Sequence, residues 1–234
     1  MVGRYRCLSS FCILLSIKLL IRILHVMSFS RFFSEQARNP SGLFGRFVMS
    51  IVFDKGNSKI NQFTVELMSV KENDHILEIG CGTGKLINEM AKQIDMGCIE
   101  GVDFSGTMVS IARRKNKNHI VNGKVKILEG NFDEISYSKN NFHKICSVNT
   151  IYFWPEPEYT TKKIADILKP QGMFLVAFED IAQLKEKPLS EDVFHLYSKN
   201  DVKNLLINAG FSSGVNVESR KVGSSLFHCV VGVK

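Results

Sequence analysis

The chain has 234 residues, of which 44% are hydrophobic and 23% are charged, and its formal net charge is +7. These fractions are typical of a globular protein, and the length fits one domain of ordinary size. Residues 1–27 carry four basic and no acidic side chains, so the remainder of the chain has a net charge of only +3. The body of the chain therefore gives little reason to expect nucleic acid as a partner.

The six cysteines form no Cys-x-x-Cys pair and have no histidine at the spacing of zinc ligands. We therefore predict no metal site. Free thiols are typical of a reducing compartment, which makes the cytoplasm the expected location.

The N-terminal segment, residues 1–26, contains an apolar run over residues 8–17 that Lys18 and Arg22 interrupt. The run is short for a transmembrane helix, which needs about 20 apolar residues, and no small-residue cleavage site follows it. We favour Met27 as the real start of the protein, with the segment as an upstream extension that folding and activity do not need. The alternative is a membrane anchor, which would make the protein membrane-associated.

Residues 28–72 precede the first predicted strand and read as three short helices. Proline and glycine break the pattern twice, which leaves helices over residues 28–38, 44–54 and 57–70. We predict a helical cap over residues 27–72. It is expected to pack on the edge of the sheet or to cover a pocket, and these two roles are compatible.

The stretch His75–Leu86, H-I-L-E-I-G-C-G-T-G-K-L, predicts a strand, a tight turn and the start of a helix. Leu86, Met90 and Ile94 follow at four-residue spacing and are expected on one face of that helix. An apolar run that carries Glu78 ends in three glycines, Gly80, Gly82 and Gly84. Glycine lets the backbone bend sharply and lets a ligand approach without meeting a Cβ atom. The following helix directs its free N–H groups toward the turn, so the stretch predicts a ligand site.

The spacing of the glycines distinguishes between three known motifs that could form this turn. A P-loop needs one more residue before its Gly-Lys-Ser/Thr, and here Leu86 follows Lys85. A dinucleotide fingerprint has its third glycine one residue later. The string L-E-I-G-C-G-T-G resembles the first motif of class I S-adenosylmethionine (SAM)-dependent methyltransferases, in which an acid stands two residues before the first glycine. The resemblance implies SAM as the cofactor, with its methionine part near Glu78, Gly80, Cys81, Gly82 and Gly84, where Cys81 is a small spacer.

A second apolar run over residues 98–103 ends in Asp103, 19 residues after Gly84. An acid at the end of the second strand of such a fold accepts hydrogen bonds from ribose hydroxyls. The string D-F-S-G-T-M from Asp103 resembles the second motif of the same family. The resemblance implies that Asp103 binds the ribose and that Phe104 lies against the adenine. We expect Ser105 to cap the helix that follows.

Two later positions are predicted to complete the site. After the third strand, the resemblance implies adenine contacts from Asn131 and Phe132, although the family usually has an acid at the first of these. An amide oxygen can still accept the hydrogen bond. After the fourth strand, Asn149 resembles a family residue beside the cofactor. Tyr152 and Trp154 then either wall the pocket near the sulfonium and the substrate, or simply pack in the core.

Strands and helices alternate along the rest of the chain. Further strands are expected at Lys124–Glu129, His143–Val148 and Met173–Glu179, and a closing hairpin at Val215–Ser219 and Leu226–Val233. The Lys-Pro-Gln-Gly segment over residues 169–172 predicts a turn before Met173. Alternation favours an α/β fold with parallel strands, and the hairpin favours an antiparallel edge. The resemblance implies a Rossmann-like, doubly wound, mostly parallel seven-stranded sheet with an antiparallel C-terminal strand and N-terminal helices. We predict a single domain over residues 27–234, with the core in residues 73–234.

The expected activity is transfer of a methyl group from SAM to a nucleophile by in-line displacement. Positioning alone can supply roughly 7–11 kcal/mol, so a dedicated base is optional, and we assign no catalytic residue. A covered, aromatic pocket favours a small-molecule or lipid-like acceptor. Two alternatives share the turn and the acid: an NAD-dependent oxidoreductase and a non-catalytic SAM-binding protein.

Overall fold

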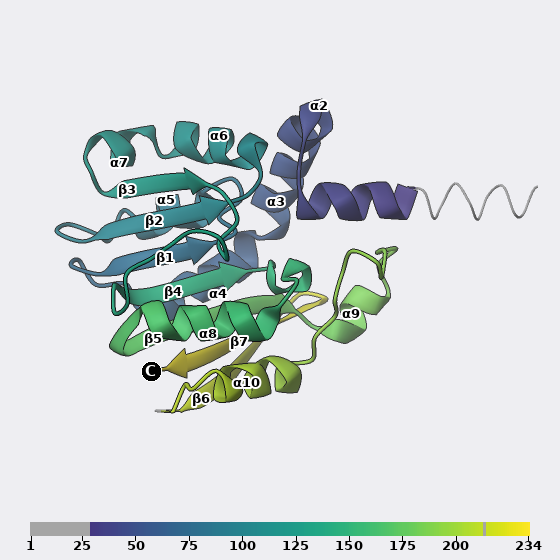
Figure 1. The fold of residues 1–234 in the computed structure, drawn as a ribbon. Helices are drawn as coiled ribbons and strands as arrows, with labels where there is room; N and C mark the ends of the chain where they lie inside the picture. Colours follow the sequence, from purple (N-terminus) through teal and green to yellow (C-terminus); the bar gives the residue numbers. More distant parts are fainter. Residues whose placement is uncertain (1–28, 213) are drawn as a thin grey trace, which may run out of the picture.

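The computed structural model describes residues 29–212 and 214–234. A seven-stranded sheet with the strand order β3-β2-β1-β4-β5-β7-β6 forms its centre (Figure 1). The strands are β1 (His75–Ile79), β2 (Cys98–Asp103), β3 (Val125–Glu129), β4 (Phe142–Val148), β5 (Leu168–Glu179), β6 (Val215–Val222) and β7 (Ser225–Val233). Strands β1 to β5 are parallel, β7 is antiparallel to β5, and β6 is antiparallel to β7. The predicted fold class is thereby confirmed.

Helices cover both faces of the sheet. The described helical segments are one over residues 29–38, α2 (Gly42–Phe44), the π-helical η1 (Gly45–Met49), α3 (Ser50–Gly56), α4 (Ser58–Met68), α5 (Lys85–Met90), α6 (Gly106–Lys115), α7 (Lys117–Val121), the 3-10 turn η2 (Ile151–Phe153), α8 (Pro157–Ile167), α9 (Ile181–Lys185) and α10 (Lys199–Asn208). Helices α8 and α10 lie in front of the sheet in Figure 1, and α4 lies behind it. Helices α4, α5 and α6 share that rear face.

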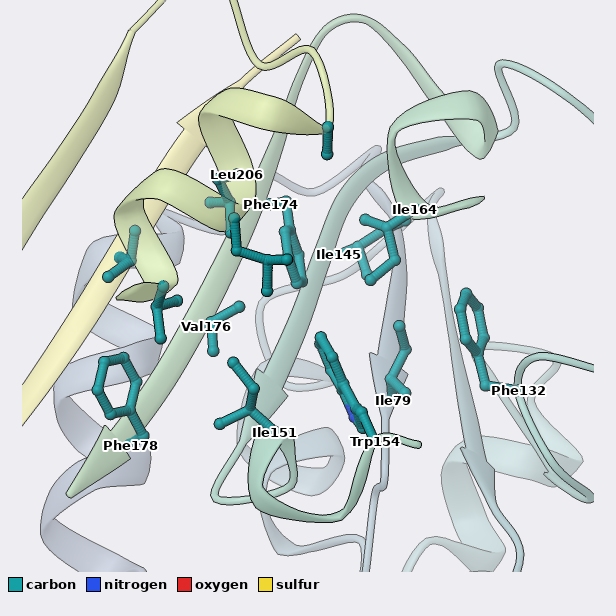
Figure 2. Packing of buried hydrophobic residues seen from close by; sticks show 14 of the residues in the cluster. Ile79, Phe132, Ile145, Ile151, Trp154, Ile164, Phe174, Val176, Phe178 and Leu206 are labelled. Atoms are coloured by element: carbon teal, nitrogen blue, oxygen red, sulfur yellow. The ribbon is translucent and has the colours of Figure 1, made fainter. Parts of the chain in front are cut away.

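The strands are apolar because helices bury them from both sides. Successive side chains of β1 alternate, so that Leu77 and Ile79 join the core under α8 and α10, while Ile76 joins the core under α4 and α5. Figure 2 shows the first of these cores, in which Trp154 and Ile151 pack near Ile79. By the same alternation Glu78 lies on the side of Ile76. A carboxyl group is therefore directed into the covered face at the end of β1.

Three element boundaries differ from the prediction by three residues or more. Helix α5 ends at Met90, so Ile94 is buried beyond the helix rather than within it. Strand β5 begins at Leu168, because the Lys-Pro-Gln-Gly segment that predicted a turn continues the strand with an irregular register. Gln171 there has a φ of +62°, the conformation that glycine adopts most easily. Strand β6 extends to Val222, three residues beyond the predicted strand end.

The predicted extension, residues 1–26, lies outside the described residues. Among the residues that the structure describes, no helix is long and apolar enough to cross a membrane.

Candidate functional site

A cavity of about 390 Å³ lies at the carboxyl ends of β1, β2 and β4. Ligands of open α/β sheets bind at this edge, where the strand order reverses. In Figure 1 the helix over residues 29–38, α2 and α3 lie beyond the arrowheads of these strands, opposite α9. The structure brings nine of the ten predicted cofactor residues to the cavity wall, together with both predicted pocket residues: Glu78, Gly80, Cys81, Gly82, Asp103, Phe104, Asn131, Phe132, Asn149, Tyr152 and Trp154. Gly84 alone among the predicted residues does not line it.

The three glycines of the turn have positive φ angles but different surroundings. A Cβ atom at Gly80 would lie 2.4 Å from Cγ2 of Thr150. At Gly84 it would lie 2.6 Å from Nδ2 of Asn116, whereas at Gly82 nothing lies closer than 3.9 Å. Packing within the protein therefore requires the first and third glycines, while the second faces the open space of the cavity.

Glu78 lies on the cavity floor with one carboxyl oxygen unsatisfied. The side chain is buried, and no described residue gives a hydrogen bond to Oε2. Burial raises the pKa of Glu78 well above its usual range, the charges of Asp103 and Glu89 raise it further, and the backbone N–H of Ile87 lowers it. A buried carboxylate without a partner is costly, so this position is suited to a cationic ligand group.

Asp103 joins the glycine turn to the end of β2. Its Oδ2 accepts a hydrogen bond from the N–H of Gly82 at 2.8 Å, and its Oδ1 accepts one from the N–H of Ser105 at 2.9 Å. Burial raises the pKa of Asp103, and these two hydrogen bonds oppose that rise. Each carboxylate oxygen has a further lone pair, so Asp103 can still accept from a ligand hydroxyl. Ser105 caps α6 as predicted, since its side chain accepts from the N–H of Met108.

The predicted adenine residues differ in exposure. Phe104 is 44% exposed at the rim of the cavity, and Phe132 is buried in its wall. The side chain of Asn131 is already engaged, because its Oδ1 accepts from the N–H of Asp133 and its Nδ2 donates to Glu134, both at 3.1 Å. These two bonds leave Asn131 one lone pair on its amide oxygen for a ligand.

Asn149 and the aromatic residues after β4 form the opposite wall. Asn149 donates from Nδ2 to Oδ1 of Asn57 at 3.0 Å and accepts from the hydroxyl of Tyr152 at 3.3 Å. The same hydroxyl accepts from the N–H of Glu179, and burial raises the pKa of Tyr152, so the phenol stays protonated. Tyr152 and Trp154 also belong to the buried core, so they both wall the cavity and pack.

Sequence reasoning missed a polar contact between α3 and the glycine turn. Asp54 accepts from the hydroxyl of Thr83 at 2.5 Å and from Nζ of Lys115 at 2.7 Å, while Nζ of Lys85 donates to its backbone oxygen at 2.8 Å. We call this group the Asp54 contact. An acid in the last turn of a helix is locally unfavourable, which was the only signal for it in the sequence. The contact fixes the N-terminal helices over the cavity.

The comparisons with known proteins agree with this geometry. Residues 70–210 match the methyltransferase domain family. The chain is 24% identical to the methyltransferase YdaC of Bacillus subtilis, over 76% of this chain and 93% of that one. It is 31% identical to the demethylmenaquinone methyltransferase of Bacillus licheniformis, over 53% of this chain and 52% of that one. A SAM-dependent methyltransferase structure from Aquifex aeolicus superposes with a TM-score of 0.61 at 20% identity, covering 74% of this chain and 88% of that one.

The chain therefore belongs to the methyltransferase domain family, as a class I SAM-dependent methyltransferase. Its cofactor is SAM. The predicted activity holds over the two alternatives, an NAD-dependent oxidoreductase and a non-catalytic SAM-binding protein.

We expect Asp54→Asn to weaken SAM binding about fivefold, because one partly exposed ion pair contributes about 1 kcal/mol. The loss should come mainly from faster dissociation, since the Asp54 contact holds the cap rather than the ligand. Stopped-flow measurement of SAM association and dissociation checks this. Asp95→Asn is the matched control, because Asp95 forms an exposed ion pair with Lys124 away from the cavity. Equal effects of the two substitutions would contradict the role given to Asp54.

Proposed function

We propose that this methyltransferase holds SAM on the glycine turn and transfers its methyl group to a small, lipid-like acceptor. The observation that carries the cofactor site is the unsatisfied oxygen of Glu78 on the cavity floor, next to the open face of Gly82. The ammonium of the methionine part supplies the cation that this carboxylate needs. Open space at Gly82 supplies the close approach to the backbone.

The other cofactor residues follow from their places on the wall. Asp103 accepts from the ribose hydroxyls with its remaining lone pairs, and the N–H bonds from Gly82 and Ser105 hold it in position. Phe104 and Phe132 contact the adenine, and Asn131 accepts from its amino group. Asn149 lies on the side where the methyl group is presented. The residues present therefore fit SAM.

The part of the cavity wall that the cofactor residues leave is mostly aromatic and aliphatic, with Arg38, Glu179 and Lys187 among its charged members. Its apolar residues include Phe33, Phe153, Trp154, Leu184, Leu189 and Phe194. Such a wall suits an apolar acceptor and excludes water, and ring faces attract a sulfonium cation. The relative from Bacillus licheniformis is named for a demethylmenaquinone acceptor, which is of this chemical class.

Bound SAM supplies an activated methyl group on a sulfonium that leaves readily. The chain contributes orientation, because both ends of the cofactor are held by separate elements while the acceptor lies between the aromatic walls. It also contributes exclusion of water, because the helix over residues 29–38 closes over the cavity. Ser30 of that helix donates to the backbone oxygen of Pro188 at 2.6 Å, and Ser34 accepts from the N–H of Ser190 at 2.9 Å. Positioning of this kind supplies most of the rate enhancement that a methyl transfer needs.

Calorimetric titration with SAM tests the cofactor site. We expect Asp103→Ala to bind SAM at least about tenfold more weakly than the wild type, or about 1.4 kcal/mol. Asp95→Ala serves as the control, since this exposed acid does not line the cavity. Absence of SAM binding in the wild type, or equal binding by the wild type and Asp103→Ala, would refute the site.

The acceptor class is tested with SAM labelled in its methyl group. Wild-type protein is incubated with an organic-solvent extract of cellular small molecules, and in parallel with protein and with nucleic acid. We expect the label in the extract, in apolar fractions. Label in protein or nucleic acid, with none in the extract, would overturn the acceptor class and leave the cofactor site intact.

A further inference from the structure

The N-terminal helices carry most of the large hydrophobic side chains that are exposed among the described residues. Twelve large hydrophobic side chains are exposed among the described residues, and seven of them lie between residues 29 and 52. We call these seven the apolar cap face: Phe29, Phe32, Leu43, Phe47, Val48, Ile51 and Val52. Leu43, Phe47 and Ile51 recur every four residues along one continuous helical run and are 76%, 60% and 55% exposed. Gathered exposure of this kind marks an interaction site, whereas single exposed hydrophobic residues are ordinary.

The net charge of the chain comes from this region and from the segment before it. Residues 28–59 contain five lysines and arginines and two acids, which gives +3, and residues 1–27 add +4. Residues 60–234 contain 21 basic and 21 acidic side chains and are neutral. Arg46 belongs to the helical run that carries Leu43, Phe47 and Ile51, whereas Arg31 is paired with Glu35 at 3.0 Å and Arg38 lines the cavity. An apolar face flanked by cations is the combination that binds anionic lipid surfaces.

The opposite sides of these helices line the cavity. Phe33, Val52 and Phe53 line the cavity, while Phe32 and Ile51 beside them are exposed and do not line it. Figure 1 shows the helix over residues 29–38 and α2 projecting beyond the carboxyl edge of the sheet. A surface that docks on the apolar cap face would therefore lie next to the cavity rather than at a remote part of the molecule.

We propose that the apolar cap face docks on an anionic lipid surface and places the cavity beside it. The positive charge of these helices favours an anionic lipid surface over the other candidates. A second copy of the chain would bring a face of the same positive charge against the first. Residues 1–28 are themselves basic and would add charge instead of neutralising it. A nucleic acid would use the cations but leave aliphatic side chains such as Leu43 and Ile51 in water.

The docking extends the proposed function, because a lipid-like acceptor would reach the cavity from that surface, yet it is measured without methyl transfer. Full-length protein is floated with vesicles of phosphatidylcholine alone and with vesicles that also contain phosphatidylglycerol. We expect flotation mainly with the second kind, decreasing as salt is raised. We expect the double substitution Phe47→Ser with Ile51→Ser to reduce partition into these vesicles about tenfold or more, because both side chains lose apolar surface to bury.

Met96→Ser with Val121→Ser is the matched control, since both side chains are 76% exposed and lie outside the apolar cap face. The control should float like the wild type, and both double variants should retain the SAM affinity and thermal stability of the wild type. Three results would overturn the proposal: equal partition by the Phe47 and Ile51 variant, equal binding to neutral vesicles, or a wild-type dimer in sedimentation that this variant converts to a monomer. If the wild type did not bind SAM, the proposed cofactor site would be wrong, but the vesicle result would still test the docking surface.

Discussion

Glu78→Gln is expected to weaken SAM binding by about 100-fold or more and, at the same time, to stabilise the ligand-free protein at neutral pH. Removing one partner of a buried ion pair costs about 3–5 kcal/mol, and Glu78 is the proposed partner of the methionine ammonium. Without ligand, the carboxylate has an oxygen with no hydrogen-bond partner among the described residues. Its charge is then a cost of folding that the amide does not carry.

The pH dependence of stability gives the sign of this effect. The folded-state pKa of Glu78 is raised above its ordinary value of 4.5, so between these two values the folded protein binds more protons than the unfolded protein. The contribution of Glu78 to the free energy of unfolding therefore falls as pH rises through that window. In Glu78→Gln this fall is absent. The free energy of unfolding of the variant, relative to that of the wild type, therefore increases with pH.

Urea unfolding at about pH 5 and pH 8, with calorimetry for SAM, measures both effects. Glu89→Gln is the matched control, because it removes a carboxylate from α5 that does not line the cavity. The control should change SAM affinity by less than about threefold. A Glu78→Gln variant that binds SAM like the wild type would contradict the role given to this carboxylate.

Gly84→Ala and Gly82→Ala are expected to separate folding from binding. At Gly84 an added methyl group meets Asn116 and Ala112 at 2.6 and 2.8 Å, in a backbone conformation with a φ of +69°. Overpacking and the left-handed backbone together should lower the free energy of unfolding by roughly 2–5 kcal/mol. At Gly82 the methyl group meets nothing nearer than Phe53 at 3.9 Å, so only the backbone term of about 1–2 kcal/mol remains.

For SAM affinity the order of the two variants should reverse. The methyl group at Gly82 would occupy the space where the cofactor approaches the backbone, and we expect a loss of about tenfold or more in Gly82→Ala. The fraction of Gly84→Ala that stays folded should bind nearly as the wild type does. Denaturant unfolding and calorimetry on the same preparations decide the matter. A larger stability loss in Gly82→Ala than in Gly84→Ala would show that the turn is packed differently.

Local motifs explain why much of the site could be predicted from the sequence. Glu78 and the glycines lie within seven residues of one another, and Asp103 follows at the end of the next strand, so neighbouring parallel strands bring them to one edge. The different roles of Gly82 and Gly84 could not be predicted in this way. They depend on Asn116, which follows the last residue of α6, and on Phe53 of α3.

The Asp54 contact and the Asn57–Asn149 hydrogen bond could not be predicted from the sequence for the same reason. The residues of these pairs are separated by 29 to 92 positions in the sequence, and no local motif at either residue predicts the contact. The start of β5 was misplaced because Lys-Pro-Gln-Gly has the composition of a turn. Pairing of Leu168 with Phe142 of β4 and the backbone hydrogen bonds of Gln171 and Gly172 with Lys234 override that local preference, and Gln171 adopts the turn-like φ within the strand.

The hydrogen bonds of the N-terminal helices also set an order of assembly. Their partners come later in the chain: Thr83, Ser105, Asn149 and Ser190. During synthesis these helices therefore leave the ribosome about 150 residues before the last of these partners. Contacts of such long sequence separation are expected to form late in folding, after the strands of the sheet have paired. The helices that cover the cavity are thus translated before the sheet, but their contacts are completed after it.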